Sequence, residues 1–515
     1  MRSVLPCGVC VALLAAPASA QEIEVIFTKI AGHPTALVPG ALDQDGNSIV
    51  TEFRAMEDLV GSQGGSRWVL KGRTQNTPDL ETIMLMGSGK SGTMFAQEGQ
   101  PIPGGEPNEV FDFFGSGVGR FDDAGRFAYS ARAKGGAASI FQKVIFWDGV
   151  TSTVVFHMGD PINGLVDLPP NPSGDETFGN SVGSIHLLNN DTIGSQDSTI
   201  LNIHSSRRPA IMYDDQAFHQ TGVTTVTGMD SLQKTWATIL ANTFYTTPDG
   251  SRWTAQGRIV ADAASDTVVV IDGAIVLQEG SEIDGSGMFF TDAFRTNLLS
   301  NGDWYTRGSS PQGHWAVRNG TLMARTGAPI FTGSEENWGA TIGGFTGNKH
   351  GDYVVLGTTT NADPAADHAI VYNGTTVAVR EGDPVDLDGN GVFDDDVFIG
   401  RGNNTLSAFD ADDLFLTDNG VLYFIANLRN SAGQDLNSNP VFGTPQALLR
   451  KIVGTVCTAD LDDDNDVDQG DLGILLANFG CTGLPGDCPG DVDGDGDVDQ
   501  SDLGALLSQF GCPHP

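Results

Sequence analysis

A short motif recurs through most of this chain: a β-rich run that ends in glycine, any residue and proline. Full copies occur at Gly32-His33-Pro34, Gly99-Gln100-Pro101, Gly159-Asp160-Pro161, Gly327-Ala328-Pro329 and Gly382-Asp383-Pro384. A degenerate copy is Gly280-Ser281-Glu282. This repetition constrains the fold strongly, because a repeat unit buries its apolar face only by stacking on its neighbours.

Two sets of turn signals accompany the motif. The first set follows an aromatic-containing run, at Asp45-Gly46, Ala124-Gly125, Asn190-Asp191, Asp249-Gly250, Asn301-Gly302, His350-Gly351 and Asn419-Gly420. The second set comes roughly 20 residues later in most units, at Asp148-Gly149, Asp214-Asp215, Asp272-Gly273, Asn319-Gly320 and Asn373-Gly374. Asn-Gly and Asp-Gly between alternating apolar runs predict hairpins, because both turn positions need positive φ.

Units of about 50 to 80 residues leave room for about four short strands each, which predicts a mainly β body over residues 21–455. We expect a seven-bladed β-propeller; a β-sandwich array or a β-solenoid is the alternative. Closure favours the propeller. The run from Glu22 to Ile30 ends in the motif that elsewhere finishes a unit, whereas the last unit, ending at residues 447–453, lacks that final strand. An N-terminal strand that completes the last blade removes the open edges.

The first 20 residues predict a secretory signal peptide. Arg2 supplies the positive charge, Val4 to Ala16 the apolar stretch, and Ala18-Ser19-Ala20 a small-residue cleavage site. This stretch is too short to span a bilayer and no later one reaches that length, so we expect a secreted or cell-surface protein without a transmembrane segment. The formal net charge of −38 argues against nucleic-acid binding and suits an extracellular or cation-binding protein.

Two acidic segments near the C-terminus repeat at a spacing of 31 residues. Their carboxylates fall at positions 1, 3, 5, 7, 9 and 12 of a calcium-binding loop, where position 7 contributes its backbone carbonyl. The expected metal ligands are Asp460, Asp462, Asp464, Asp466, Asp468 and Asp471, then Asp491, Asp493, Asp495, Asp497, Asp499 and Asp502. The turn at position 6 needs positive φ, which Gly496 supplies and Asn465 supplies less well.

An apolar stripe with helical spacing follows each loop. The stripes are Leu472, Leu475, Leu476 and Phe479, and then Leu503, Leu506, Leu507 and Phe510. Each loop therefore leads into one amphipathic helix, and the two helices are expected to pack face to face. Because the tail holds fourteen acidic residues and no Lys or Arg, calcium binding and folding of this segment should be coupled.

Two loop–helix units, each with Asp rather than Glu at position 12 followed by Leu, resemble a type I dockerin over Asp460 to Gly511. The resemblance implies a module at residues 456–515 that binds two calcium ions and docks to a cohesin-like partner. It also implies recognition through loop positions 10 and 11, here Gln469-Gly470 and Gln500-Ser501. Neither is the hydroxyl pair common in cellulosomal dockerins. The body resembles tandem β-repeat bodies of uncharacterised secreted proteins from planctomycete-type bacteria, which implies no known chemistry.

The cysteines divide between the two ends of the chain. Cys7 and Cys10 lie in the signal peptide, and the remaining four are Cys457, Cys481, Cys488 and Cys512. An exported protein with an even cysteine set in its tail predicts two disulfides there. Antiparallel helices favour Cys457–Cys512 with Cys481–Cys488, but pairing within each copy, Cys457–Cys481 with Cys488–Cys512, is almost as plausible.

One further acidic loop lies in the body. Asp386, Asp388 and Asn390 alternate with other residues around Gly389 and Gly391, and Asp394 and Asp396 follow. Such oxygen side chains on a glycine-relaxed loop can converge on one hard cation, which predicts a third calcium site. Position twelve is Val397, so the closing acid of an EF-hand loop is missing. A solvated acidic turn is the alternative.

No catalytic motif is identified. Residues 86–91 and 179–183 approximate a phosphate-binding loop and a nucleophile elbow, but neither has the required strand-to-helix context. The dockerin resemblance implies a polysaccharide setting, with the tail tethering a propeller that binds a glycan or a protein. The alternatives are a glycoside hydrolase or polysaccharide lyase with its site in the propeller, whose carboxylates the 65 acids do not single out, and a purely structural surface protein.

Overall fold

The structure is a computed structural model. It describes residues 23–115, 119–136, 142–401, 407–436, 444–454, 459–461, 467–482, 488–493 and 496–512. The predicted signal peptide lies outside these ranges. Among the described residues, no helix has both the length and the apolar character needed to cross a membrane.

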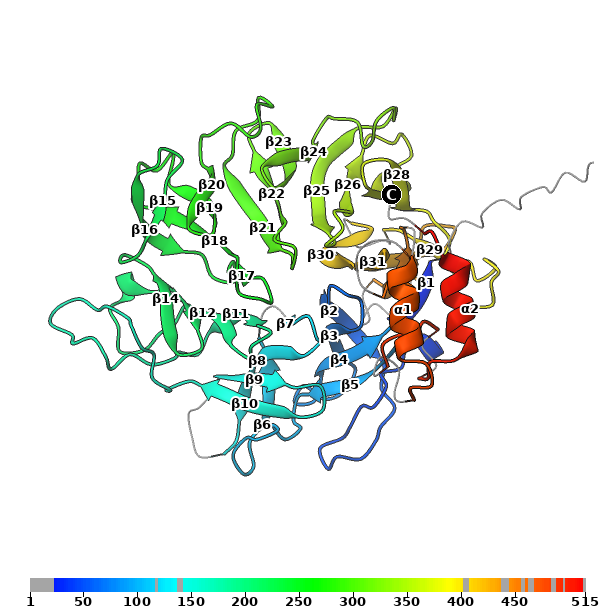
Figure 1. Ribbon diagram of the computed structural model, residues 1–515, viewed down its shortest axis with the longest axis horizontal. Coiled ribbons are helices and arrows are strands. Elements are labelled where there is room, and N and C mark those ends of the chain that lie inside the picture. Colours follow the sequence, from blue (N-terminus) through cyan, green and yellow to red (C-terminus); the bar gives the residue numbers. More distant parts are fainter. Residues whose placement is uncertain are drawn as a thin grey trace, which may run out of the picture.

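The described strands form seven sheets that follow one another around a ring (Figure 1). The first four sheets in chain order comprise β2 (Phe53–Gly61), β3 (Trp68–Thr74), β4 (Thr82–Ser88) and β5 (Ser91–Gln97); β6 (Val110–Phe114), β7 (Arg120–Phe121), β8 (Phe127–Lys134), β9 (Gln142–Trp147) and β10 (Ser152–His157); β11 (Val182–Leu187), β12 (Ile193–Asp197), β13 (Ala210–Tyr213) and β14 (Gln216–Gln220); and β15 (Thr225–Thr227), β16 (Gln233–Ile239), β17 (Tyr245–Thr246), β18 (Trp253–Ile259), β19 (Thr267–Ile271) and β20 (Ala274–Gln278).

The remaining three sheets complete the ring. They comprise β21 (Asp292–Leu298), β22 (Trp304–Ser310), β23 (Gly313–Arg318) and β24 (Thr321–Arg325); β25 (Trp338–Gly347), β26 (Tyr353–Thr359), β27 (His368–Tyr372) and β28 (Thr376–Arg380); and β29 (Phe398–Ile399), β30 (Phe409–Leu416), β31 (Val421–Arg429) and β32 (Gln446–Ile452) with β1 (Glu24–Thr28). Two 3-10 turns lie at Pro34–Ala36 and Ser205–Arg207. The chain is mainly β and has a β-propeller arrangement.

The predicted turn pairs are largely confirmed as hairpins. Asn301-Gly302 joins β21 to β22 and Asn319-Gly320 joins β23 to β24, and the same pattern recurs in other sheets. The Asp45-Gly46 turn is a hairpin too, since Leu42 bridges Ser48, but it precedes β2 rather than joining two blade strands. In that sheet, the β2–β3 turn is instead formed by residues 62–67, with Gly65 at positive φ.

Four full copies of the motif and its degenerate copy connect neighbouring sheets, whereas the Gly32 N–H donates instead to Glu52 Oε1 at 2.9 Å. In each connecting copy, the glycine N–H donates to the carbonyl of a buried residue at the start of the following sheet, and that residue's N–H donates back to the motif. At Gly327, the distances are 2.8 Å to the Trp338 carbonyl and 2.8 Å from the Trp338 N–H to the Ala328 carbonyl. Equivalent glycine–acceptor pairs at the motif are Gly99–Phe111, Gly159–Phe178, Gly280–Phe290 and Gly382–Ile399, and the Gly222–Trp236 pair lies at a junction without the motif. These glycines all have positive φ, which explains their recurrence.

The ring is closed by the two ends of the body. β1 pairs antiparallel with β32, with Glu24 opposite Arg450 and Thr28 opposite Ala447. The expectation that an N-terminal strand completes the last sheet is therefore confirmed. The pairing covers the outer edge of β32 and joins residues more than 400 positions apart in the sequence.

Apolar side chains fill the spaces between neighbouring sheets. Trp68, Trp236, Trp315 and Trp338 are among the largest fully buried side chains. One cluster packs Trp338 and Phe345 of β25 against Tyr305 of β22, so each sheet depends on the next for burial of its apolar face. The body therefore has a core divided into wedges rather than one central core.

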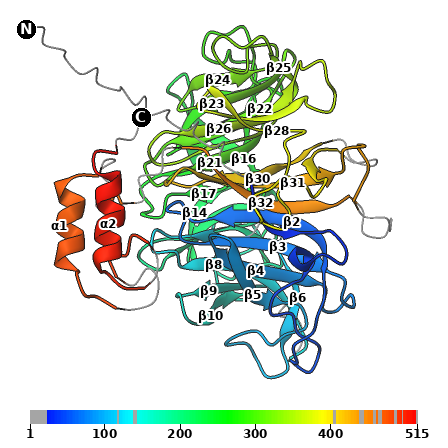
Figure 2. The ribbon, with the colours of Figure 1, turned by 90° about the vertical axis from the view of Figure 1, so that its right-hand side faces the viewer.

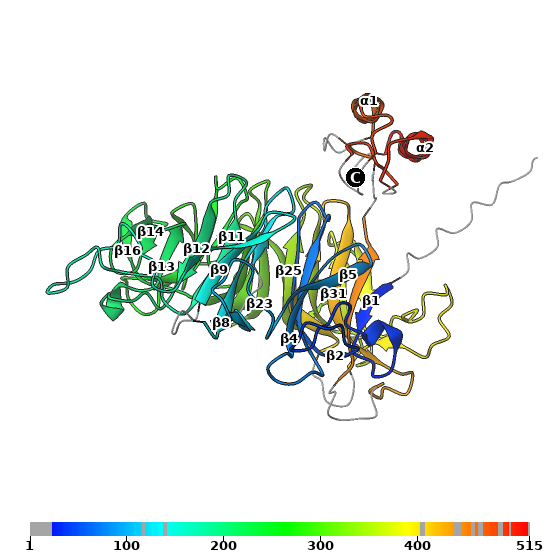
Figure 3. The ribbon, with the colours of Figure 1, turned by 90° about the horizontal axis from the view of Figure 1, so that it is seen from below.

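The C-terminal tail forms two helices, α1 (Gln469–Ala477) and α2 (Gln500–Gln509). Figures 2 and 3 show them side by side, outside the ring and on one of its faces. Leu475 and Leu506 are buried in a small core with Val467 and Val498. The predicted stripes pack only in part. Leu472 and Leu503 are partly buried against this core. The other members of the two stripes stay exposed: Leu476, Phe479, Leu507 and Phe510.

The glycine geometry predicts unequal effects of alanine substitutions. A Cβ at Gly327 would meet no atom within 4 Å, so Gly327→Ala should lower the unfolding free energy by about 1 to 2 kcal/mol through the strain of a φ of +80° alone. Gly99→Ala should cost more, because its Cβ would also lie 2.8 Å from the Asp79 carbonyl. Gly343→Ala is the control, since the φ of Gly343 is unstrained and its nearest neighbour lies at 3.8 Å. Chemical denaturation measures all three, and equal effects would contradict the role given to the motif.

Candidate functional site

One strand from each sheet lines a cavity on the axis of the ring, which we call the axial cavity. Its volume is about 520 Å³, within the range of ligand sites. Every sheet contributes lining residues, through β2, β7, β11, β17, β21, β25 and β30. Asp460 of the tail also borders it. The ring topology therefore brings residues from all seven sheets together in one cavity.

A smaller chamber of about 210 Å³ adjoins the axial cavity. The two share Leu59, Val60, Arg120, Tyr245 and Arg295 in their linings. The smaller chamber adds residues that lie slightly earlier on the same strands or loops, among them Asp58, Phe294 and Asp413. The shared residues therefore form a partition, which we call the waist, between two chambers.

The polar side chains of the waist are Arg120, Arg295 and Tyr245. Arg120 Nη2 donates to Tyr245 Oη at 3.0 Å, and the Arg120 guanidinium carbon lies 5.1 Å from the Tyr245 ring centre. Arg295 Nη1 donates to the Asp412 carbonyl at 3.0 Å, and its Nε donates to Asn297 Oδ1 at 3.2 Å. Burial raises the pKa of Tyr245, but the charges of Arg295 and Arg120 outweigh it and hold that pKa below its ordinary value.

One carboxyl of the smaller chamber is protonated at neutral pH. Burial and the like charges of Asp58 and Asp410 raise the pKa of Asp413 to about 8, against the opposing effects of Arg295 and the Leu59 N–H. The Leu59 N–H donates to Asp413 Oδ1 at 3.1 Å. Asp413 is thus a potential proton donor beside the waist.

His186 of β11 also lines the axial cavity. Burial and the charge of Arg120 lower the pKa of His186 to about 3, so its imidazole is neutral. Its Nε2 lies 3.1 Å from the Phe244 carbonyl, which fixes the ring. The sequence singled out none of these residues. The sequence signal that could have pointed to this cavity is an arginine inside a short β-rich run, because the chain has only 27 Lys and Arg.

The tail carboxylates predicted as metal ligands cluster at the start of each helix, as far as they are described. Asp468 caps α1 and Asp471 returns a bond to the cap; Asp499 and Asp502 do the same for α2. Asp471 and Asp502 have no exposed surface. Asp502 Oδ1 accepts from the Val492 N–H at 2.7 Å and Oδ2 from the Asp499 N–H at 2.7 Å.

Ligand oxygens converge in the second loop. Those of Asp491, Asp493 and Asp502 lie within 4.8 Å of one another, as do those of Asp497, Asp499 and Asp502. Gly496 has a φ of +97°, as the turn requires. The predicted ligands Asp462, Asp464, Asp466 and Asp495 lie outside the described residues.

The predicted recognition residues begin the two helices. Gln469, Gly470, Gln500 and Ser501 are exposed. The Gly470 and Ser501 N–H groups donate to the capping carboxylates of Asp468 and Asp499, each at 2.6 Å. These positions are available to a partner from solvent.

One tail disulfide is defined, Cys481–Cys488. It agrees with the first of the two predicted connectivities and is incompatible with Cys457–Cys481 and Cys488–Cys512. Cys512 is also disulfide-bonded. Cys457 lies outside the described residues.

The acidic loop of the body gathers a different set than predicted. Asp386, Asp388 and Asp395 bring carboxylate oxygens within 4.8 Å of one another, whereas Asp394 and Asp396 are not part of this cluster. The Asp386 carboxylate is already surrounded by N–H donors from Gly389, Asn390 and Gly391. Asp396 instead accepts from the Ser431 N–H, because its positive φ redirects the chain.

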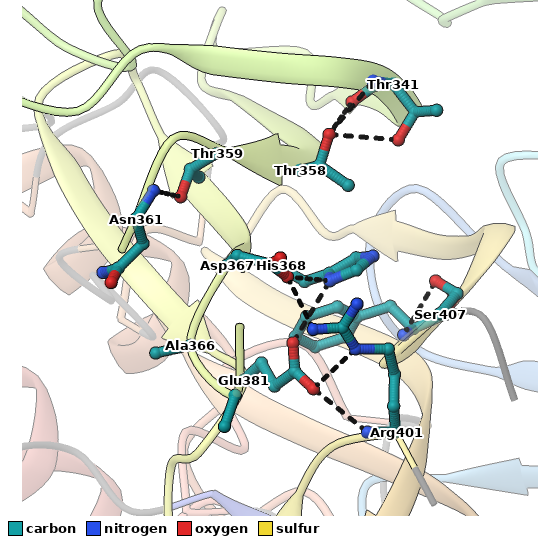
Figure 4. Close-up of polar contacts among 12 residues, drawn as sticks. Thr341, Thr358, Thr359, Asn361, Ala366, Asp367, His368, Glu381, Arg401 and Ser407 are labelled. Atoms are coloured by element: carbon teal, nitrogen blue, oxygen red, sulfur yellow. Dashed lines mark hydrogen bonds and ion pairs between the residues drawn. The ribbon is translucent and has the colours of Figure 1, made fainter. Parts of the chain in front are cut away.

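A further cluster, Asp367, His368 and Glu381, contains mixed metal-ligating groups (Figure 4). Arg401 donates to both acids, at 2.9 Å to Asp367 Oδ1 and 3.1 Å to Glu381 Oε1. His368 Nδ1 lies 2.8 Å from Asp367 and 3.2 Å from Glu381. The guanidinium already supplies the positive charge, so this cluster fits a structural ion-pair network better than a metal site.

No known protein family and no curated protein matches the chain. Similar solved structures include prolyl oligopeptidase B from Galerina marginata bound to a 35mer hydrolysis and macrocyclization substrate, with 10% identity, a TM-score of 0.32 and coverage of 76% of this chain and 48% of that one. The chain thus spans about half the length of that protein. An oligogalacturonate lyase in complex with manganese has 10% identity, a TM-score of 0.28 and coverage of 77% and 88%. Trypanosoma rangeli sialidase in complex with sialic acid has 10% identity, a TM-score of 0.30 and coverage of 85% and 60%.

The raised pKa of Asp413 predicts a pH-dependent stability. Between the ordinary aspartate pKa of 3.8 and the folded value of about 8, the folded chain holds a proton that the unfolded chain releases. The contribution of Asp413 is therefore complete below pH 4 and declines as the pH rises to about 8. Between pH 5 and pH 9, the parent protein should lose more unfolding free energy than the Asp413→Asn variant does, by on the order of 3 kcal/mol.

Urea denaturation at the two pH values measures this difference. Asp175→Asn, which alters an exposed loop aspartate, is the matched control and should follow the parent protein. A parent-like pH profile for Asp413→Asn would show that Asp413 is ionised in the folded protein.

Proposed function

We propose that the chain is an exported calcium-binding protein in which a dockerin-like module, residues 456–515, docks or tethers a ligand-binding β-propeller, residues 21–455. The observation that carries this proposal is the convergence of Asp491, Asp493 and Asp502 at the start of α2, in the spacing that is duplicated before α1. Seven blades are proposed for the body, one for each sheet of the ring.

Electrostatics support calcium in the tail. Carboxylate oxygens within 4.8 Å repel one another, and the tail contains no Lys or Arg to offset them. A divalent cation would remove this repulsion, and oxygen ligands on a loop with Gly496 at position 6 suit calcium. Two ions are proposed for the tail. A third is proposed for the body loop at Asp386 and Asp388, with Asp395 replacing the ligands first expected.

The exposed face of the tail supports docking. Leu476, Phe479, Leu507 and Phe510 remain 54%, 47%, 53% and 45% exposed, although they lie on a module whose core is small. Apolar side chains gathered on exposed helix surfaces are typical of protein-binding surfaces. The predicted recognition residues lie on the same two helices. A cohesin-like module is the proposed partner, in a secreted or cell-surface, polysaccharide-related setting.

A glycoside hydrolase or lyase remains the second candidate, and one observation favours it. Asp413, protonated at neutral pH, lines the same chamber as Asp58. Asp58 is ion-paired with Lys71 at 3.2 Å. Glycoside hydrolysis requires a pair of carboxyl groups, one of which donates a proton. Release of reducing ends from polysaccharides, lost in Asp413→Asn, would support this candidate.

Calcium titration of the full chain tests the first part of the proposal. Calorimetry should find two tight sites and a third in the body. Asp493→Asn should weaken one tail site at least about tenfold because it removes a charged ligand, and Asp388→Asn should affect only the body site. Asp175→Asn is the control. A chain that binds no calcium would refute the dockerin-like assignment.

Binding to a purified cohesin module tests the second part. Binding should require calcium and disappear in EDTA. Because the two helices present similar surfaces, the double variant Leu476→Asp/Leu507→Asp should abolish binding, whereas either single change should weaken it only in part. Val150→Asp/Val260→Asp is the matched control, since these valines of the body are also exposed, at 87% and 68%. Calcium-loaded protein that binds no cohesin would limit the tail to a structural role.

A further inference from the structure

We propose that the waist of the axial cavity, formed by Arg120, Tyr245 and Arg295, binds the oxyanion of an acidic saccharide, a carboxylate or a sulfate. This inference rests on the proposal that the body holds its ligand in the axial cavity, and it names the class of that ligand. The three side chains come from β7, β17 and β21, and all three border both chambers.

The charge distribution around the waist favours an anion. The hydrogen bonds of Arg295 to Asp412 and Asn297 go to a carbonyl and an amide oxygen, which are neutral acceptors. The Asp412 carboxylate is instead bonded by Arg307 Nε at 3.0 Å. Asp58 pairs with Lys71, and Asp413, which lines the smaller chamber with Arg295, has a pKa raised to about 8.

A concentration of positive charge at this place needs a physical reason. The chain carries a formal net charge of −38, so its general field repels anions. Burying guanidinium groups is unfavourable unless negative charge or good acceptors surround them. Asp412 and Asp413 already favour the charged form of Arg295, whereas burial and the charge of Arg295 lower the pKa of Arg120. A bound oxyanion would add negative charge beside Arg120, and the planar guanidinium suits bidentate contact with carboxylate or sulfate oxygens.

Tyr245 completes the oxyanion site. Its oxygen accepts from Arg120, which leaves its own O–H to donate elsewhere. The two neighbouring guanidinium charges that lower the pKa of Tyr245 also make its phenol a stronger donor. An oxyanion at the waist would therefore receive bonds from two cations and one polarised hydroxyl.

The residues that line the larger chamber suggest that the bound carboxylate or sulfate belongs to a saccharide. Amide side chains of Gln63, Asn297 and Asn419 line it, together with the aromatic rings of Phe121 and Phe415. Amides bond sugar hydroxyls, and flat rings contact the apolar faces of sugar rings. The volume of about 520 Å³ suits a short oligosaccharide rather than a free small ion.

Calorimetry on the full calcium-loaded chain tests the inference. The probes are a galacturonate oligomer, a sulfated galactan oligomer and a neutral galactan oligomer of equal length. We expect one or both acidic oligomers to bind at least about tenfold more tightly than the neutral one, with the preference decreasing as salt increases. The first two probes distinguish carboxylate from sulfate.

Variants locate the binding site. Arg295→Gln and Arg120→Gln should each weaken the preferred acidic oligomer about tenfold or more, and Tyr245→Phe should weaken it less while keeping the ring. Arg325→Gln, at an exposed arginine on β24, is the matched control. If an arginine variant does not fold, two measurements still test the oxyanion site. They are the effect of Tyr245→Phe and the ratio of the affinities of the parent chain for acidic and neutral oligomers.

The outcomes separate this inference from the proposed function. Equal binding of neutral and acidic oligomers, lost when the axial cavity is altered, would overturn the oxyanion site but keep a ligand-binding body. Acidic binding unaffected by all three waist variants would place the site elsewhere and overturn the inference. Failure of all three probes to bind would overturn the inference and leave docking by the tail to stand on its own tests.

Discussion

The backbone pair at the Gly-x-Pro motifs between neighbouring sheets, from Gly99 onward, is the interaction on which the remaining structure depends. A glycine N–H such as that of Gly327 and the N–H of Trp338 exchange bonds between adjacent sheets, and the same exchange recurs around the ring. It fixes how far each sheet is displaced from the next, so that apolar side chains fill the wedges between them. Pairing of β1 with β32 then closes the circle. Without both, the inner strands would not share an axis.

Closure also produces the chemistry of the body. Arg120, Tyr245 and Arg295 belong to three sheets, and Asp413 to a fourth; each is unremarkable on its own strand. On a common axis, burial and like charges raise the pKa of Asp413, and the charges of Arg295 and Arg120 lower the pKa of Tyr245 despite its burial. The titration behaviour is therefore a property of the ring rather than of any one repeat unit.

The tail differs from the body, because its acidic residues lie close together in the sequence and need no distant strand to bring them near one another. Position 12 of each loop, Asp471 or Asp502, serves at once as a helix-capping group and as a proposed calcium ligand. Its burial brings like charges together, which makes the segment sensitive to a cation. The body instead places many of its acids in ion pairs such as Arg318–Asp303.

Local sequence determined the features whose partners are near in the chain: the hairpin turns, the positive-φ glycines and the loop–helix spacing. The closing β1 strand has a distant partner, and it was recognisable because it ends in the repeated motif. Two local predictions needed correction. Asp395 joined Asp386 where Asp394 and Asp396 were expected, and Leu476 stayed exposed where packing was expected. Only the tertiary structure decided the axial cavity, because nothing in residues 120, 245 and 295 reveals that their strands face one axis until closure of the ring brings them together.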